Sequence, residues 1–132
     1  MIIRVTPDKE KARSLLGLIA EREQFATLID HQKFPTPATE NYYEIIKELA
    51  TALLLLEGFK AIGEHAHKDL IESLLRYQEF SEPDIVFLHD LRIKRNYSSY
   101  EGKKIDTSYL KNQKGKILEI AGRLKTMIKR RL

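Results

Sequence analysis

The chain has 132 residues, 42% of them hydrophobic and 32% charged, and it contains no cysteine. This length predicts a single domain, residues 1–132, that buries a core without disulfides. The lack of cysteine excludes disulfides, cysteine-ligated zinc, iron–sulfur clusters and thiol catalysis by this chain. We find neither a signal peptide nor an apolar run long enough to cross a bilayer, and therefore expect a soluble, cytoplasmic protein.

The basic residues are concentrated toward the C-terminus. The whole chain has a formal net charge of +4. From Arg92 onward it holds thirteen basic and three acidic residues, a net charge of +10, whereas residues 1–66 hold eight basic and ten acidic ones. Such a region favours a polyanionic partner. A solvated face ending in a basic last turn, which complements the helix dipole, would give the same composition.

The first helix signal is Thr6-Pro7-Asp8, which combines a capping hydroxyl, a proline at the first position and an acid in the first turn. Apolar residues then recur at three- and four-residue spacing. They predict a helix that runs to about Asp30 with an inward face made of Ala12, Leu15, Leu16, Ile19, Ala26 and Ile29.

The second helix signal follows the break at Lys33–Pro37 and starts at Thr36 or Thr39. The stretch Tyr42–Ile62 continues it and ends near Gly63. Because this stretch is apolar nearly all round toward its end, we expect a central helix. Acidic residues and a tyrosine pair near its start are explained by packing and by the helix dipole.

Three further helices are predicted in the second half. One spans His67–Phe80, the next is capped by Ser81 and covers Ile85 to about Asn96, and the last is capped by Asp106. The expected inward residues are Leu70, Ile71, Leu74 and Leu75 in the first of these and Leu110, Ile117, Ala121, Leu124 and Ile128 in the last. Short connections between amphipathic helices predict an all-α, antiparallel up-and-down bundle of about five helices, without a sheet.

The segment Leu91–Gly102 is the most informative part of the chain. At about 100° per residue, Arg95 falls between Leu88 and Leu91, inside the apolar stripe. A cation there has to be ion-paired, at a cavity edge or at a subunit interface, because isolated burial is too costly. A second, polar stripe arises if the helix continues far enough, formed by His89, Arg92, Asn96 and Tyr100.

This arrangement is typical of a phosphate or sugar cleft, because arginine binds phosphate bidentately and aromatic rings stack on bases. The alternative is a buried Arg95–Asn96 pair that closes a helix end. The candidate residues for binding a nucleic acid or nucleotide are Arg92, Lys94, Arg95, Asn96, Tyr97, Tyr100, Lys103 and Lys104.

Arg95-Asn96 followed by Tyr100-Glu101-Gly102 resembles the motif of the HEPN superfamily, the "higher eukaryotes and prokaryotes nucleotide-binding" domains. These small helical bundles carry an arginine, a polar residue and then a histidine four to six positions after the arginine. The order of helices and the place of the motif agree over essentially the whole chain, with Tyr100 where the histidine would stand.

The resemblance implies a homodimer in which two motifs face each other across a shared cleft. Many family members are metal-independent endoribonucleases of toxin–antitoxin modules, encoded beside a minimal nucleotidyltransferase, and others bind nucleotide, RNA or a partner protein. By this resemblance Arg95 would stabilise the phosphate and Asn96 would orient it, while the residue at the histidine position would handle protons.

The tyrosine at the histidine position weakens the case for catalysis. Tyrosine in general titrates near pH 10, whereas imidazole titrates at about 6.5, closer to working pH. The nearest imidazole along the helix, His89, lies about 9 Å from Arg95. We therefore expect RNA or nucleotide binding without a cofactor or metal. The alternatives are an endoribonuclease that uses Tyr100 or His89, and a dimeric interaction module without a ligand.

One further cluster has the composition of a metal site, His65-Ala66-His67 beside Glu64 and Asp69. Residues two apart on a helix point to nearly opposite faces, so chelation would require a turn at this point. We therefore interpret the cluster as a polar connection between helices.

Overall fold

The computed structural model describes residues 1–132 as five α-helices, one 3₁₀ helix and a two-stranded sheet. In chain order the elements are β1 (Ile2–Arg4), α1 (Lys9–Leu28), α2 (Pro35–Leu56), β2 (Phe59–Ala61), α3 (Ala66–Ser73), η1 (Leu74–Arg76), α4 (Glu82–Glu101) and α5 (Thr107–Arg131). The prediction of an all-α bundle of about five helices is confirmed.

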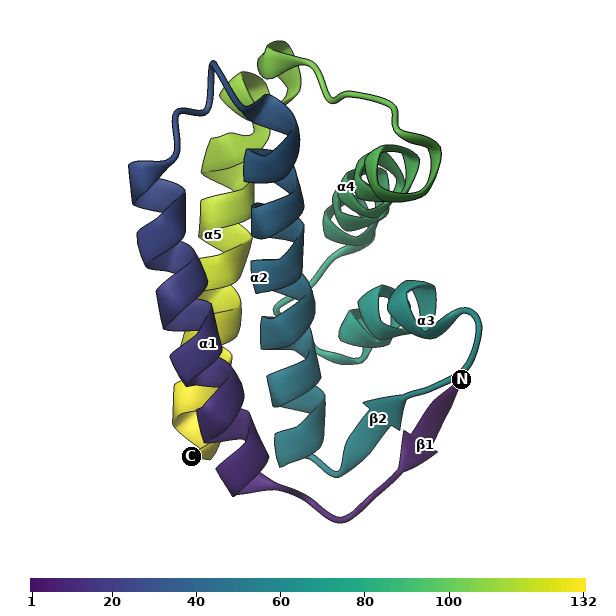
Figure 1. Ribbon diagram of the computed structural model, residues 1–132. Coiled ribbons are helices and arrows are strands. Elements are labelled where there is room, and N and C mark those ends of the chain that lie inside the picture. The colour runs from purple at the N-terminus through teal and green to yellow at the C-terminus, as the bar shows by residue number, and fades with distance from the viewer.

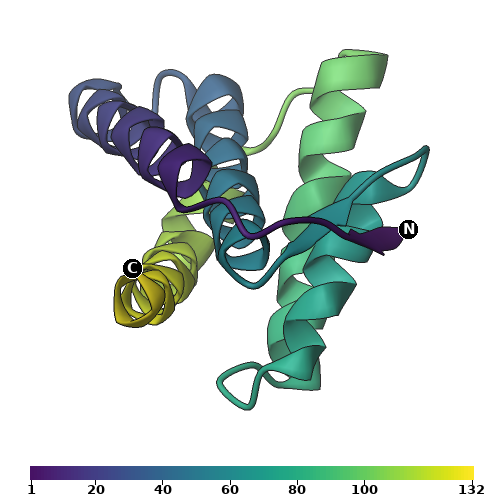
Figure 2. The ribbon, with the colours of Figure 1, turned by 90° about the horizontal axis from the view of Figure 1, so that it is seen from below.

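Three long helices, α1, α2 and α5, lie side by side, and α1 runs opposite to the other two (Figure 1). Helix α4 crosses this group. It is seen nearly end-on in Figure 1 and lengthwise in Figure 2. Helix α3 lies between α4 and the small sheet, and both α3 and β2 pack against α2 (Figure 1). Helix α2 stands in the middle and contacts each of the other four α-helices.

The central position of α2 agrees with its composition. Fourteen of its 22 residues are buried, which leaves this helix without a continuous face toward solvent. One cluster of 28 buried side chains forms the core and draws on every α-helix. The inward stripe predicted for the last helix is confirmed, because all five of its residues are buried.

The prediction of no sheet, with a second helix running to Ile62, is wrong. Helix α2 ends at Leu56, and β2 pairs antiparallel with β1. Gly58 makes the turn between α2 and β2 with a φ of +81°, a conformation that L side chains rarely adopt. A Cβ at this position would also lie 2.8 Å from the carbonyl oxygen of Val5, so glycine is required both by the turn and by the neighbouring chain.

The predicted caps at Ser81 and Asp106 are confirmed, whereas α2 begins at Pro35 after Phe34, before the predicted start at Thr36 or Thr39. Asp84 accepts a hydrogen bond from the backbone N–H of Ser81 at 3.0 Å, and Asp106 accepts one from the first turn of α5 at 3.0 Å.

The first helix differs, since Asp8 rather than Thr6 caps α1. The backbone N–H of Asp8 donates to the carbonyl of Leu55. This hydrogen bond holds the residues before Asp8 against α2, so they do not join α1.

Two helix ends differ from the predicted ones. Helix α3 stops at Ser73 instead of Phe80 and passes into η1, whose changed geometry leaves Leu75 44% exposed instead of inward. Helix α4 continues past Asn96 to Glu101 and ends at Gly102, whose φ of +68° forms a left-handed cap. The extra turn matters for the site, because it keeps residues 97–101 helical.

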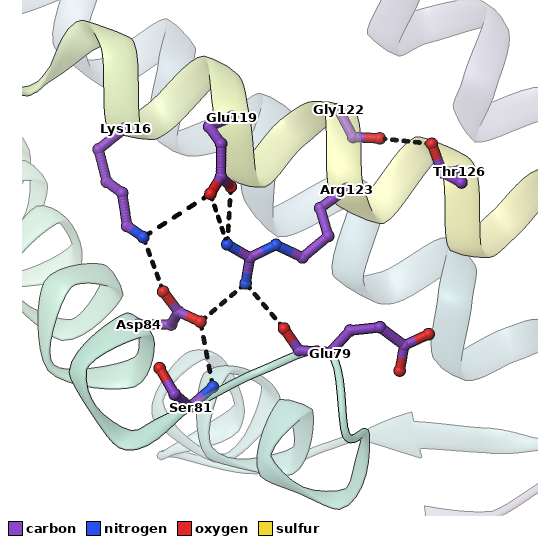
Figure 3. Close-up of polar contacts among 8 residues, drawn as sticks. All are labelled: Glu79, Ser81, Asp84, Lys116, Glu119, Gly122, Arg123 and Thr126. Carbon is purple, nitrogen blue, oxygen red and sulfur yellow. Dashed lines mark hydrogen bonds and ion pairs between the residues drawn. The ribbon is translucent and has the colours of Figure 1, made fainter.

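An ion-pair network joins the start of α4 to α5 (Figure 3). The Asp84 carboxylate is 8% exposed and accepts from Lys116 Nζ at 2.8 Å and from Arg123 Nη1 at 2.7 Å. Burial alone would raise the pKa of Asp84, but the hydrogen bonds from Lys116, Ser81 and Arg123 hold it well below its usual range. Arg123 also binds both carboxylate oxygens of Glu119 at 2.7 Å.

We expect Asp84→Asn to lower the free energy of unfolding at pH 7 by about 2 kcal/mol, because two cations lose their buried partner. The folded-state pKa lies below the unfolded one, so this stabilisation is present above pH ~4 and is lost as the pH falls. Urea unfolding at pH 7 and pH 3 measures the difference. Glu21→Gln, an exposed site on α1, is the matched control. If the difference in unfolding free energy between wild type and Asp84→Asn were the same at pH 7 and pH 3, the lowered pKa of Asp84 would be contradicted.

Candidate functional site

Arg95 lies in the C-terminal half of α4, and its side chain forms an ion pair with α2. Its guanidinium is 15% exposed and donates from Nη2 to Glu44 Oε1 on α2 at 2.9 Å. The same group lies 5.3 Å from the ring centre of Tyr43 and 5.7 Å from that of Tyr100. The second oxygen of Glu44 binds Lys47 Nζ at 2.6 Å. Of the three environments that the sequence allows for this cation, the ion pair is the one observed.

Glu44 belongs to a row of acids at one-turn spacing on α2. None of them lies in the first turn of the helix, so their interpretation as helix-dipole acids is wrong. Glu40 accepts from the Ser98 hydroxyl at 2.9 Å, and Glu48 accepts from Arg22 Nε at 2.7 Å. The row therefore ties α2 to α4 at two levels and to α1 at a third.

A polar pocket of about 240 Å³ lies between the start of α3 and the C-terminal half of α4. One wall is formed by residues 63–68 and the other by Arg92, Asn96 and Tyr100. These three residues follow each other at four-residue spacing, so the extended α4 presents them on one face. The predicted polar stripe is confirmed for them, whereas His89, one turn earlier, does not line the pocket.

Two cations in the pocket wall have no acidic partner. No carboxylate lies within 4.0 Å of Arg92 or of Lys68, and Glu64 is the only acid in the lining. Arg92 Nε donates to His89 Nδ1 at 3.3 Å, and His89 Nε2 lies 3.4 Å from Glu72. Both ring nitrogens of His89 therefore already have partners, Arg92 at Nδ1 and Glu72 at Nε2.

His67 is the imidazole that sequence reasoning missed. The sequence places only His89 near Arg95, but the structure brings His67, at the start of α3, into the pocket wall. Burial lowers the pKa of His67, and the positive charges of Lys47 and Arg95 lower it further. The ring is therefore neutral at pH 7 and has a lone pair to accept a proton. Only its position in the cluster His65-Ala66-His67 could have signalled it.

A buried phenol lies against the same groups. Tyr43 is 1% exposed, its ring centre is 6.2 Å from that of His67, and its hydroxyl has no hydrogen-bond partner. Burial raises the pKa of Tyr43 to about 12, although the charges of Arg95 and Arg92 act in the opposite direction. The phenol therefore keeps its proton at neutral pH and remains a donor without an acceptor.

The other predicted binding residues lie away from this pocket. Lys103 and Lys104 line a separate hollow of about 430 Å³ beside the connection between α1 and α2. The Tyr97 ring is half exposed with Lys103 Nζ 4.8 Å from its centre, and Lys94 lies over the ring of Tyr109 at 5.4 Å. The eight candidate residues thus divide between the pocket, the ion pair beneath it and a basic flank.

The chain has no group of three or more histidine, aspartate or glutamate side chains placed to hold a metal ion. None of its helices combines the length and apolar character needed to cross a membrane. No protein-family model matches the sequence, no curated protein matches it, and no solved structure matches it.

We expect Arg95→Ala and Glu44→Ala to destabilise the protein non-additively, with a coupling free energy of about 1–3 kcal/mol, because the pair is largely buried. Urea unfolding of both single variants and the double variant gives this value. Arg92→Ala, which breaks no ion pair, should change stability by less than about 0.5 kcal/mol. Additive effects of Arg95→Ala and Glu44→Ala would show that the pair contributes nothing.

Proposed function

We propose that this protein binds RNA or a nucleotide at the polar pocket between α3 and α4. The observation that carries the proposal is the pair of cations without an acidic partner, Arg92 and Lys68, on the two walls of one polar pocket. A guanidinium donates two parallel hydrogen bonds to a phosphate. Asn96 adds a neutral donor and acceptor, and Tyr100, 73% exposed, offers a ring on which a base stacks.

The proposal moves the phosphate contact from Arg95 to Arg92. Arg95 already binds Glu44, and its Nη1 lies 3.3 Å from the Tyr100 hydroxyl and 3.5 Å from Asn96 Oδ1. It therefore acts as a positioning residue that holds Asn96 and Tyr100 at the pocket edge. Arg92 shares the same helix face and has no acidic partner to displace.

The basic flank supports a polymeric ligand. Lys103 and Lys104 follow the end of α4 and line the neighbouring hollow, and the chain from Arg92 onward carries a net charge of +10. A single-stranded RNA anchored at the pocket would extend across this flank, and its affinity would fall with salt.

The resemblance to HEPN proteins extends the proposal to a cytoplasmic homodimer and to partnership with a minimal nucleotidyltransferase in a toxin–antitoxin-type module. An exposed apolar stripe on α4, formed by Val86, Ile93, Tyr97 and Tyr100, supports a partner face beside the pocket. Light scattering should give twice the mass of one chain. A dimer that binds no RNA would favour the interaction-module alternative instead.

We expect Arg92→Ala to weaken binding of a labelled single-stranded RNA about tenfold, because one charge-assisted phosphate contact is lost. The slope of log affinity against log salt should fall by about 0.7 in magnitude. Fluorescence anisotropy measures both quantities. Arg13→Ala, which removes the same charge from an exposed site on α1, is the control. Equal affinities for wild type and Arg92→Ala would refute the pocket as the RNA site.

A second candidate function, metal-independent RNA cleavage, is favoured by the neutral imidazole of His67 in the pocket wall. In this reaction the RNA 2′-oxygen attacks the adjacent phosphorus and His67 takes its proton. The bond from phosphorus to the 5′-oxygen breaks, and the leaving oxygen takes a proton from water or from His65. The products are a 2′,3′-cyclic phosphate and a 5′-hydroxyl. His67 then fills the role for which sequence reasoning considered Tyr100 or His89.

We expect His67→Asn to reduce cleavage in the presence of chelator at least 100-fold, while RNA binding changes less than about threefold. The wild-type rate should rise with pH as His67 loses its proton, and reach half of its plateau below pH 6.5, because burial and neighbouring cations lower the pKa of His67. His31→Asn is the control, because the His31 ring contacts the carbonyl of Ala26 and does not line the pocket. Absence of cleavage by wild-type protein at every pH would remove this function and leave binding.

A further inference from the structure

A second cavity, of about 350 Å³, lies between α1, α2, β2 and α3. Helices α1 and α3 both pack on α2, but no extensive contact joins α1 to α3 or to β2. The cavity occupies the space that this arrangement leaves open over α2. Its volume lies in the range of pockets that hold small organic ligands, and the proposed RNA contacts do not use it.

Most of the cavity lining is hydrophobic. Leu54, Leu55 and Leu70 are buried and form its inner wall, whereas Leu18 is 42% exposed and lies at its opening. A hydrocarbon group that enters the cavity leaves water and covers this apolar surface, and both changes favour binding. The lining therefore favours a ligand with an apolar body.

Most polar side chains of the lining already have partners inside the protein. Glu48 Oε1 accepts from Arg22 Nε at 2.7 Å, and Lys47 Nζ lies 2.6 Å from Glu44 Oε2. The Thr51 hydroxyl donates to the backbone carbonyl of Lys47 at 2.8 Å. The two ion pairs cancel each other's charges, so these groups give the cavity no net charge.

Lys60 is the cation of the lining without an acidic partner. It lies exposed on β2, at the opening, and no carboxylate lies within 4.0 Å of its ammonium group. Burial and neighbouring cations lower the pKa of His67, which also lines the cavity, so its ring is neutral at pH 7. The opening thus carries one positive charge beside an apolar interior.

We propose that this cavity binds a medium-chain fatty acid, with its hydrocarbon tail against the buried leucines of α2 and α3 and its carboxylate at Lys60. The tail matches the apolar lining, and the single negative charge matches the single cation that has no acidic partner. The inference goes beyond the proposed function, because Arg92 and Lys68 line a different pocket.

Isothermal titration calorimetry with a series of fatty acids tests whether the tail enters the cavity. From butanoate to octanoate, each added methylene should tighten binding about fourfold, because it buries further apolar surface. The gain should stop once the chain outgrows the cavity. A constant gain up to hexadecanoate would indicate adsorption on the protein surface and would overturn the proposal, as would equal affinities for butanoate and octanoate.

A change at Lys60 tests the position of the carboxylate. Lys60→Gln should weaken octanoate binding about fivefold and leave binding of 1-octanol unchanged, because only octanoate carries a charge. Lys129→Gln, which removes the same charge from an exposed site on α5, is the control. Equal octanoate affinities for wild type and Lys60→Gln would contradict the proposed site.

A cavity-filling variant provides an independent test. Thr51 lines the cavity, and Thr51→Leu should weaken binding of both octanoate and 1-octanol at least tenfold. Thr126→Leu is the matched control, since the exposed Thr126 of α5 donates to the carbonyl of Gly122 four residues earlier, as Thr51 does to Lys47 (Figure 3). Thermal unfolding checks that each variant is folded. Unchanged octanoate affinity in Thr51→Leu would overturn the cavity as the site.

The outcomes separate this inference from the proposed function. If wild-type protein binds RNA but no fatty acid, the cavity site is refuted and the RNA pocket stands. If wild-type protein binds octanoate but not RNA, and Thr51→Leu loses octanoate binding, the cavity site stands alone.

Discussion

The burial of α2 is the constraint on which the rest of the structure depends. Most polar side chains of a helix packed on nearly all sides have to find their partners inside the protein, because little water reaches them. Glu40, Glu44 and Glu48 stand one turn apart on this helix, and their partners come from α4 and α1. The acids of the central helix therefore determine where the neighbouring helices lie along it.

The same constraint divides the cations of α4 into two kinds. Arg95 lies on the buried face and is held by Glu44, so it cannot bind a phosphate without leaving a buried carboxylate with one partner fewer. Arg92 lies toward α3 and has no acidic partner. In the proposed function, one arginine positions the site while the other meets the ligand.

Helix α3 completes the site because its start lies beside two cavities of different chemistry. His67 lines the polar pocket with Arg92 and the apolar cavity with Glu48. The small sheet contributes Phe59 to the apolar side, so elements from both halves of the chain form the two cavities.

The sequence by itself determined the helices, their caps at Ser81 and Asp106, and the polar stripe of α4, because these features depend on residues within one or two turns of each other. Tertiary structure decided the strand pairing that follows the end of α2 at Leu56, since hydrogen bonds between segments over fifty residues apart leave no local pattern. It also decided which side chains meet. The partner of Arg95 lies 51 residues away on another helix, and His67 approaches α4 only once both helices pack on α2.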